Sequence, residues 1–300
     1  MGWSLPTPRA APKRAASADA PACYRSRRRR YRECTVTATQ VIPETGVDAP
    51  PFWMTALESR AALEYANWRL LLPLLRRLPV GDGHPVLVLP GFTAADRSTA
   101  ALRWLLRDLG YRTYGWRLGT NLGPTPNILE GLDKRVARIR RSNNHAPISI
   151  VGWSLGGIFA RYLARENPEY FRQVITLGSP FRTRLGDRSA VSGLWDSLSP
   201  LHDADFLEAF AMAERPPLHI PATSVYSRTD GVVSWKLCLE TKSPIAENVE
   251  VFGSHSGMGF NTAVAYVIAD RLSQPVANWR RFRPPLLLRG LYPRAKNYRG

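Results

Sequence analysis

The stretch Gly152-Trp153-Ser154-Leu155-Gly156 decides the fold predicted for this 300-residue chain. It follows an apolar run at residues 147–151, which is typical of a buried strand, and it precedes a helical pattern at residues 155–167. Glycines two positions before and after a serine let a strand and a helix approach closely at a sharp turn. The hydroxyl of Ser154 is then expected to project from the end of the strand, beside a helix N-terminus that stabilises negative charge.

Two later segments carry the residues that would activate such a serine. Residues 220–226 have the composition of a strand and run into a turn with Asp230, and residues 248–252 alternate like a strand and end in a glycine-flanked loop with His255. A neutral imidazole can take the serine proton, and a carboxylate holds that imidazole in the correct tautomer. We therefore predict Ser154, Asp230 and His255 as a catalytic triad.

Structural interpretations compete with this one, because Asp-Gly is a common turn pair and a lone loop histidine is usually a surface residue. The other candidates fit less well, since no other histidine follows a late strand and the rival acids fall between the strands at 171–177 and 220–226. These other candidates are His84, His145, His202, His219, Asp187, Asp196, Asp203 and Asp205.

An oxyanion site should come from the loop after the first core strand. Residues 84–90 form a near-continuous apolar run, as expected for a strand buried on both faces, and Gly91 and Phe92 follow it. We predict the backbone N–H groups of Phe92 and Leu155 as the two donors. The alternative is that Gly91 is an ordinary loop glycine.

On these residues the chain resembles the α/β-hydrolase superfamily. More narrowly, it resembles the lipase and esterase branch, which includes bacterial triacylglycerol lipases, inositol-deacylase-like proteins and lecithin–cholesterol-acyltransferase-like proteins. The resemblance covers about residues 84–272, and its motifs lie at residues 85–92, 152–157, 178–180, 227–233 and 254–255. Many relatives have histidine where this chain has Trp153. The resemblance implies that Trp153 binds substrate at the pocket floor, and the substrate itself stays open.

Strands and helices alternate from residue 84 onward, which predicts one α/β layer structure with a mainly parallel sheet flanked by helices. Six core strands are expected, which indicates a compact α/β-hydrolase fold without the first two of the usual eight strands. The predicted strands are 84–90, 111–118, 147–151, 171–177, 220–226 and 248–252, and the predicted helices are 98–109, 128–141, 155–167 and 259–272. The hydrolase domain is assigned to residues 84–275.

Residues 181–219 form a long insertion after the strand that follows the serine helix. Insertions at this point commonly form lids in the superfamily that the chain resembles. Apolar side chains in the insertion could cover a fatty substrate, or they could pack on the sheet as ordinary helices. They are Leu194, Trp195, Leu198, Leu201, Phe206, Leu207, Phe210 and Met212.

Residues 1–53 are rich in Pro, Ala and Arg and are predicted to be a disordered basic tail, which is not translated if Met54 is the first residue. The tail lacks the apolar core of a secretory signal, and an organellar transit peptide stays open. Residues 54–83 are predicted to be a helix and linker, with Thr55 and Glu58 as a capping box. This helix is too short to span a bilayer and would pack on the domain or on a membrane surface.

The net charge of +17 lies mainly in the two ends of the chain, since residues 1–53 hold nine basic and four acidic residues and residues 271–300 hold eight basic and no acidic ones. This distribution does not indicate a nucleic-acid partner. The basic and aromatic tail at residues 276–300 is predicted either to pack on the domain or to make a peripheral membrane contact. Three cysteines without a disulfide pattern favour a reducing compartment, and a cytoplasmic location is predicted.

The sequence thus favours a serine hydrolase that cleaves small-molecule carboxylic esters, with an acyl chain on the substrate. An acyltransferase with the same triad and a non-catalytic hydrolase-like scaffold are the alternatives. No cofactor or metal is predicted, because no Cys/His cluster has zinc spacing and no glycine-rich phosphate loop is present. The oligomeric state stays open.

Overall fold

The computed structural model describes residues 46–184, 186–211 and 216–293. Most of the predicted basic tail at residues 1–53, with Cys23 and Cys34, therefore lies outside the described residues. Met212 of the insertion and the last seven residues of the chain also lie outside them.

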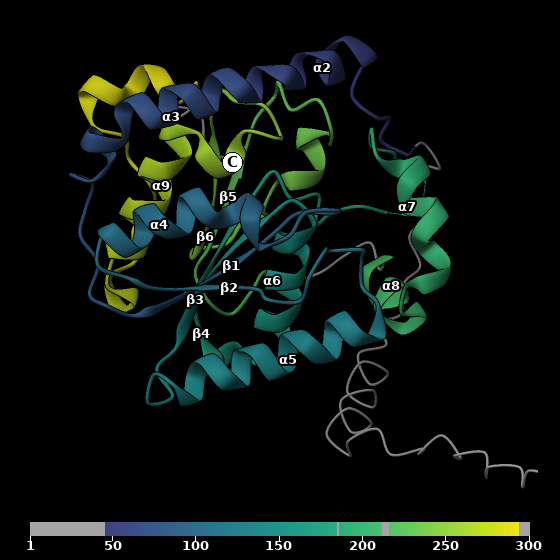
Figure 1. Ribbon diagram of the computed structural model, residues 1–300, viewed down its shortest axis with the longest axis horizontal. Coiled ribbons are helices and arrows are strands. Elements are labelled where there is room, and N and C mark those ends of the chain that lie inside the picture. Colours follow the sequence, from purple (N-terminus) through teal and green to yellow (C-terminus); the bar gives the residue numbers. More distant parts are fainter. Residues whose placement is uncertain (1–45, 185, 212–215, 294–300) are drawn as a thin grey trace, which may run out of the picture. The chain divides into compact units, whose positions relative to one another are not determined.

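Six parallel strands form a sheet in the order β2-β1-β3-β4-β5-β6 (Figure 1). The strands are β1 (Pro85–Leu89), β2 (Arg112–Gly115), β3 (Ile148–Trp153), β4 (Phe171–Leu177), β5 (Ala222–Tyr226) and β6 (Ala246–Glu250). The six strands predicted from the sequence are confirmed. The predicted strand at 111–118 is too long, because Arg117 has a φ of 58° and cannot continue an extended strand. Since all strands run in one direction, their carboxyl ends meet at one edge.

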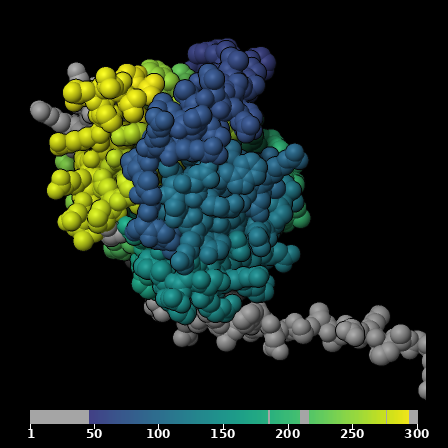
Figure 2. All heavy atoms as spheres, turned by 60° about the vertical axis from the view of Figure 1, so that its left-hand side comes forward, coloured from purple at the N-terminus to yellow at the C-terminus, as the bar shows by residue number. Residues whose placement is uncertain are grey.

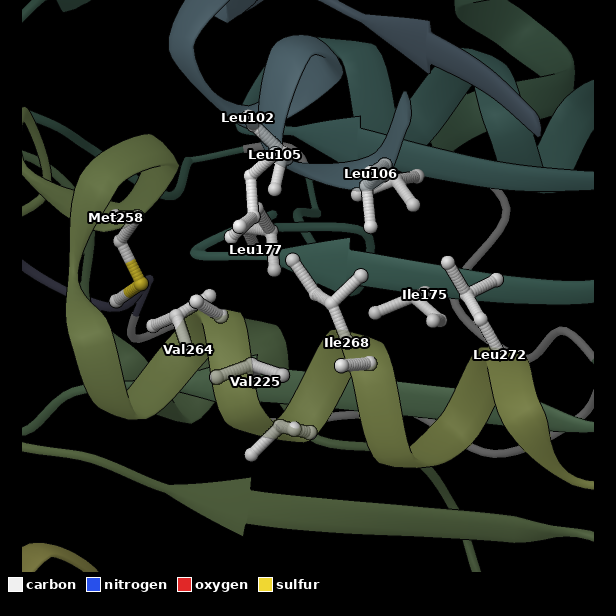
Figure 3. Close-up of a cluster of buried hydrophobic side chains, with 14 of the residues drawn as sticks. Leu102, Leu105, Leu106, Ile175, Leu177, Val225, Met258, Val264, Ile268 and Leu272 are labelled. Carbon is white, nitrogen blue, oxygen red and sulfur yellow. The ribbon is translucent and has the colours of Figure 1, made fainter. Parts of the chain in front are cut away.

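Helices cover both faces of this sheet (Figure 1). On one face, α4 (Ala100–Asp108) and α9 (Thr262–Ser273) pack against β4 and β5 in an apolar cluster that Figure 3 shows. On the other face, α5 (Pro126–Arg141) and α6 (Leu155–Glu166) pack in a second cluster with Trp116 and Phe159. Strand β1 is buried along its whole length, which explains its unbroken apolar sequence.

Capping side chains set the starts of two helices away from their predicted positions. Helix α5 begins at Pro126 rather than at residue 128, because Thr125 caps it by accepting a hydrogen bond from the N–H of Ile128. Helix α9 begins at Thr262 rather than at residue 259, because the side chain of Asn261 caps it by accepting hydrogen bonds from the N–H groups of Ala263 and Val264. The segment between β6 and α9 consists of the loop with His255 and a short 3₁₀ turn (Met258–Phe260).

The N-terminal helical segment consists of α2 (Phe52–Ala56), a 3₁₀ turn (Leu57–Arg60) and α3 (Ala61–Leu75). The predicted capping box is wrong, because the helix already begins at Phe52 and no side chain caps it. Trp68 of α3 is buried in the core cluster with α4 and α9, so this segment packs on the domain. None of the helices in the described part of the chain combines the length and the apolar character needed to cross a bilayer.

The insertion contains α7 (Ser192–Leu198), a 3₁₀ turn (Ser199–Leu201) and α8 (Ala204–Ala211). Phe206 is buried and contacts the rings of Phe159 and Tyr162 on α6. Leu194 and Leu201, in contrast, are about half exposed. The insertion therefore packs on the sheet layer through one set of side chains and presents another set to solvent. Its movement as a lid stays a prediction.

The C-terminal segment contains two 3₁₀ turns (Val276–Asn278 and Leu286–Leu291) and lies against α9. Phe282 contacts the rings of Tyr266 and Tyr292, and the Tyr292 hydroxyl donates a 3.0 Å hydrogen bond to the carbonyl of Ala263. Leu286 and Leu287 are exposed. The segment therefore has one side that packs on the domain and an apolar side that does not.

A buried ion pair joins α6 to the segment after β5. Glu240 pairs with Arg161, whose guanidinium also lies over the ring of Phe181. Glu240→Ala leaves this guanidinium buried without its carboxylate, and the expected loss in the free energy of unfolding is about 3–5 kcal/mol. Urea denaturation measures this loss. The control is Glu130→Ala, which removes an exposed i,i+4 partner of Lys134 and should cost about 0.5 kcal/mol or less. A loss no larger than that of the control would contradict the buried pair.

Candidate active site

Ser154 occupies the predicted sharp turn between β3 and α6. Its φ of 52° and ψ of −123° are strained for a residue with a Cβ, and such strain clusters at functional sites. Its N–H donates a 2.8 Å hydrogen bond to the carbonyl of Leu177, which ties the turn to the end of β4. A Cβ on Gly156 would collide with the carbonyl oxygens of Leu89 and Pro90, so the helix can approach the sheet this closely only with glycine there.

Asp230 and His255 meet across the loops that follow β5 and β6. The Nδ1 of His255 lies 2.6 Å from Oδ2 of Asp230. The other carboxylate oxygen accepts hydrogen bonds from the N–H groups of Val232 and Val233, each at 2.9 Å. Both side chains are buried. The carboxylate is therefore held from two sides, with one oxygen aimed at the imidazole.

Gly178 and Trp153 bring this pair next to the serine turn. Gly178, directly after Leu177, has a φ of 52°, and a Cβ there would lie 3.1 Å from both Asp230 Oδ2 and His255 Nδ1. The indole N–H of Trp153 donates a 3.0 Å hydrogen bond to the carbonyl of His255. The three predicted residues thus gather at the carboxyl edge of the sheet. Trp153 contacts the histidine loop directly, and its predicted contact with substrate stays a prediction.

The surroundings of His255 act in opposite directions on its pKa. Burial disfavours the imidazolium and lowers the pKa, whereas the charge of Asp230, the hydrogen bond to Asp230 and the charge of Glu58 raise it. The net direction is upward from the ordinary value. With Nδ1 held by Asp230, Nε2 is the nitrogen that can accept a proton from a serine.

The loop after β1 lies against the serine turn, as the predicted oxyanion site requires. A Cβ on Gly91 would lie 3.2 Å from the Cβ of Ser154. The N–H of Leu155 is the first of α6 and has no carbonyl partner within the helix. In the described part of the chain, no backbone hydrogen bond of a turn or loop uses the N–H of Phe92 or Leu155. The loop that carries Phe92 therefore lies beside the serine turn, and the role of these two N–H groups stays a prediction.

Asn121 holds this loop, and the sequence analysis missed it. The side-chain amide of Asn121 donates a 2.9 Å hydrogen bond to the carbonyl of Pro90, and its backbone exchanges hydrogen bonds with Thr93 and Ala94. Asn121 is fully buried. In the sequence it lies between Gly119 and Gly123, a composition that indicates an exposed loop, so no signal distinguished it.

Glu58 is the second residue that the sequence analysis missed at this edge. One carboxylate oxygen accepts hydrogen bonds from the N–H of Gly231 at 2.8 Å and from the N–H of His255 at 2.9 Å. The other oxygen accepts from the N–H of Ser256 at 2.8 Å. Because Glu58 lies 173 and 197 residues before the first two partners, no local pattern could reveal these contacts.

A second Asp, His and Ser arrangement lies at the opposite edge of the sheet. His84 bonds to Asp82 through Nδ1 and to the hydroxyl of Ser149 through Nε2 at 2.8 Å. Ser149 has no exposed surface, and Asp82 is also paired with Arg172. This arrangement has the connectivity of a triad, but a substrate cannot reach its serine.

Three of the four rival acids have partners away from this site. Asp187 accepts from the N–H of Val47, Asp196 pairs with Arg188, and Asp203 accepts from the N–H of Phe206 at the start of α8. In the described residues, no group of three or more His, Cys, Asp or Glu side chains could hold a metal ion.

Comparison with known sequences gives one family match. The model of a family described as alpha/beta hydrolase fold matches residues 64–229. The matched region includes Phe92 and Ser154 and ends one residue before Asp230, so the family match does not cover Asp230 or His255. Among curated proteins, none matches this sequence.

Several solved structures are similar to the chain. Lipase B of Aspergillus fumigatus has a TM-score of 0.50 at 15% identity, over 66% of this chain and 54% of the lipase. One of the metagenome-derived lipolytic enzymes LipS and LipT has a TM-score of 0.47 at 17% identity, over 65% of this chain and 93% of that enzyme. The Bacillus licheniformis lipase BlEst2 has a TM-score of 0.47 at 15% identity, over 66% of this chain and 95% of that lipase. The match thus spans about half of the fungal lipase, and at this identity it supports the fold alone.

The two buried histidines give a pKa prediction with an internal reference. Burial lowers the pKa of His84, whereas the pKa of His255 is raised. NMR titration should therefore place the two imidazoles on opposite sides of the ordinary value of about 6.5. Asp230→Asn should lower the pKa of His255 and leave that of His84 unchanged. An unchanged pKa of His255 would contradict the pairing.

The raised pKa of His255 also determines how the free energy of unfolding depends on pH. Because the folded-state pKa of His255 is raised, its pairing stabilises the fold fully below the unfolded-state pKa, and this contribution is lost as the pH rises through the folded-state pKa. Urea denaturation at several pH values should therefore show that the cost of Asp230→Asn shrinks as the pH rises across this window.

Proposed function

This chain belongs to the α/β-hydrolase fold family, and on that premise we propose that it is a serine hydrolase that cleaves carboxylic esters, with the character of an esterase or lipase. The observation that carries the proposal is the 2.6 Å contact between His255 and Asp230 beside the strained turn at Ser154. A base oriented by a carboxylate next to a serine is what nucleophilic catalysis requires.

In the proposed reaction, Nε2 of His255 takes the proton of Ser154 while Oγ attacks the ester carbonyl carbon. The carbonyl oxygen becomes negative and is held by the N–H groups of Phe92 and Leu155. Losing one such donor typically costs about 2.7–4 kcal/mol of barrier lowering. The imidazolium then protonates the leaving alcohol, and the acyl group stays on Ser154. A water molecule, deprotonated by the same imidazole, releases the carboxylic acid and regenerates the serine.

The insertion supports an acyl chain on the substrate. The ring of Trp195 on α7 contacts the ring of Phe92 edge to face, with centroids 5.4 Å apart. An apolar helix therefore reaches the same loop that carries one proposed oxyanion donor. Leu194, the neighbour of Trp195, is about half exposed and can offer apolar surface to an acyl chain.

The nucleophile is tested by ester hydrolysis and by covalent labelling. Wild-type protein should hydrolyse p-nitrophenyl esters in a series from acetyl to palmitoyl, and Ser154→Ala should reduce turnover to background because it removes the proposed nucleophile. A fluorophosphonate should label wild type stoichiometrically and leave Ser154→Ala unlabelled. The control is Ser149→Ala, which removes the serine of the buried arrangement and should be labelled like wild type.

The outcomes separate the alternatives. Labelling without turnover on any ester would favour acyl transfer to an alcohol or thiol acceptor. Failure of a folded wild-type protein to label would contradict a reactive Ser154 and favour a non-catalytic scaffold.

We propose in addition that the C-terminal segment makes a peripheral contact with an anionic membrane. Leu286 and Leu287 are 75% and 98% exposed, and exposed Arg283 and Arg289 flank them. No acidic residue lies between residues 271 and 300. Figure 2 shows this segment in yellow beside the N-terminal helices in purple and blue, where Leu70 is also exposed. Apolar side chains among unopposed arginines match the surface of an anionic bilayer.

Vesicle flotation tests this contact. The double variant Leu286→Ser and Leu287→Ser should bind anionic vesicles more weakly than wild type, because each change removes apolar surface that would enter the interface. Deleting the segment is unsuitable, since Phe282 and Tyr292 pack on the domain. The control is Leu201→Ser, an exposed leucine of the insertion. Equal flotation of the double variant and wild type would refute the contact.

A further inference from the structure

The N-terminal helices contact the aspartate loop and the histidine loop at the same time. Thr55 donates a 2.7 Å hydrogen bond from its hydroxyl to the carbonyl of Gly231, next to Asp230. A Cβ on Gly231 would collide with the carbonyl of Met54, so the two backbones are in close contact there. Glu58 lies one helical turn later, and one of its carboxylate oxygens accepts hydrogen bonds from the N–H groups of both Gly231 and His255.

Arg60 and Glu64 extend this contact along both loops. The guanidinium of Arg60 donates to the carbonyl of Thr229 in the aspartate loop and, at 2.9 Å, to the carbonyl of Gly253 in the histidine loop. Glu64 accepts a 2.8 Å hydrogen bond from the N–H of Ser254. The two loops are thus joined through side chains of the N-terminal segment as well as through the bond between Asp230 and His255.

We infer that Glu58 is a positioning residue of the active site, which fixes the distance between Asp230 and His255 by binding the backbone of both loops with one carboxylate. The inference rests on the proposed function. Glu58 does not reach the reacting atoms; it acts through the N–H groups of Gly231, His255 and Ser256. A shift of either loop would lengthen the bond that orients the imidazole, and misplacement of about 1 Å can cost about a hundredfold in rate.

Besides holding the two loops, the Glu58 carboxylate acts on His255 through its negative charge. Burial raises the pKa of the carboxyl, but hydrogen bonds from Ser256, His255 and Gly231 lower it further than burial raises it. Glu58 therefore stays ionised, and its charge helps to raise the pKa of His255. Other charged groups at the two loops include the carboxylates of Asp230 and Glu64, the guanidinium of Arg60, and Arg228, which pairs with Glu250. An ionised Glu58 favours the imidazolium that forms when the serine proton is transferred.

A residue that only stabilises the fold and a residue that positions the active site have different effects when they are replaced. If Glu58 only stabilises the fold, its removal lowers the free energy of unfolding and leaves the reactivity of folded protein and its pH dependence unchanged. If Glu58 positions the active site, its replacement changes the reaction rate of Ser154 and the pKa of His255 in protein that is fully folded. The rate and its pH profile therefore distinguish the two roles.

The test compares Glu58→Gln and Glu58→Ala with wild type in the full-length chain. Glu58→Gln keeps the side-chain volume, removes the charge and replaces one acceptor oxygen with an amide donor. We expect fluorophosphonate labelling of Ser154 to slow by about tenfold to a hundredfold in folded Glu58→Ala. In Glu58→Gln we expect a smaller loss of rate and an acid limb of the pH profile shifted to lower pH. The pKa of His255, measured by NMR, should shift in the same direction. Glu130→Gln is the control for loss of a surface carboxylate.

Two results would overturn the inference. One is an unfolding midpoint that falls in both Glu58 variants while the labelling rate and its pH profile equal those of Glu130→Gln. The other is an unchanged pKa of His255 in Glu58→Gln, which decides the matter even if Glu58→Ala does not fold. Absence of labelling in wild type counts against the proposed function instead, and the pKa of His255 in Glu58→Gln then still decides whether Glu58 acts on the imidazole.

Discussion

The contact between Asp230 and His255 is the interaction on which the proposed chemistry depends, because it decides which imidazole nitrogen is free to face Ser154. Parallel strands deliver both residues to one edge, but loops that follow strands are free to move apart. Several independent contacts prevent this. Val232 and Val233 hold the carboxylate, and the indole of Trp153 holds the carbonyl of His255. The N-terminal helices close the arrangement from outside the sheet.

Much of this architecture could be predicted from the sequence, because its determinants are local. The glycine pattern around Ser154 is typical of a sharp turn between strand and helix, and the apolar run of β1 is typical of a strand buried on both faces. The order of Ser154, Asp230 and His255 after their strands followed from the same reasoning. The errors lie at the ends of elements: a capping side chain such as Asn261 moves a helix start by several residues, and the positive φ of Arg117 ends β2 early.

The remaining parts of the site could not be predicted, because their partners are far apart in the chain. The sequence predicts Glu58 as half of a local capping box, whereas its carboxylate accepts hydrogen bonds from backbone groups 173 to 198 residues later. Asn121 carries no distinguishing signal among its glycine neighbours, yet it is fully buried and holds the loop after β1 by a hydrogen bond to the carbonyl of Pro90. In both cases a polar side chain forms hydrogen bonds with backbone groups of an irregular loop near the site. Which backbone groups need such a partner becomes clear only when the loop conformation is known.

The central claim is that Ser154 reacts through His255, and the pH dependence of its labelling tests this most directly. The rate of fluorophosphonate labelling should rise with pH through a midpoint that equals the pKa of His255 measured by NMR in the same buffer. Agreement of the two values identifies His255 as the base. A labelling rate that does not follow the titration of His255, or a folded protein in which Ser154 does not label, would contradict the account.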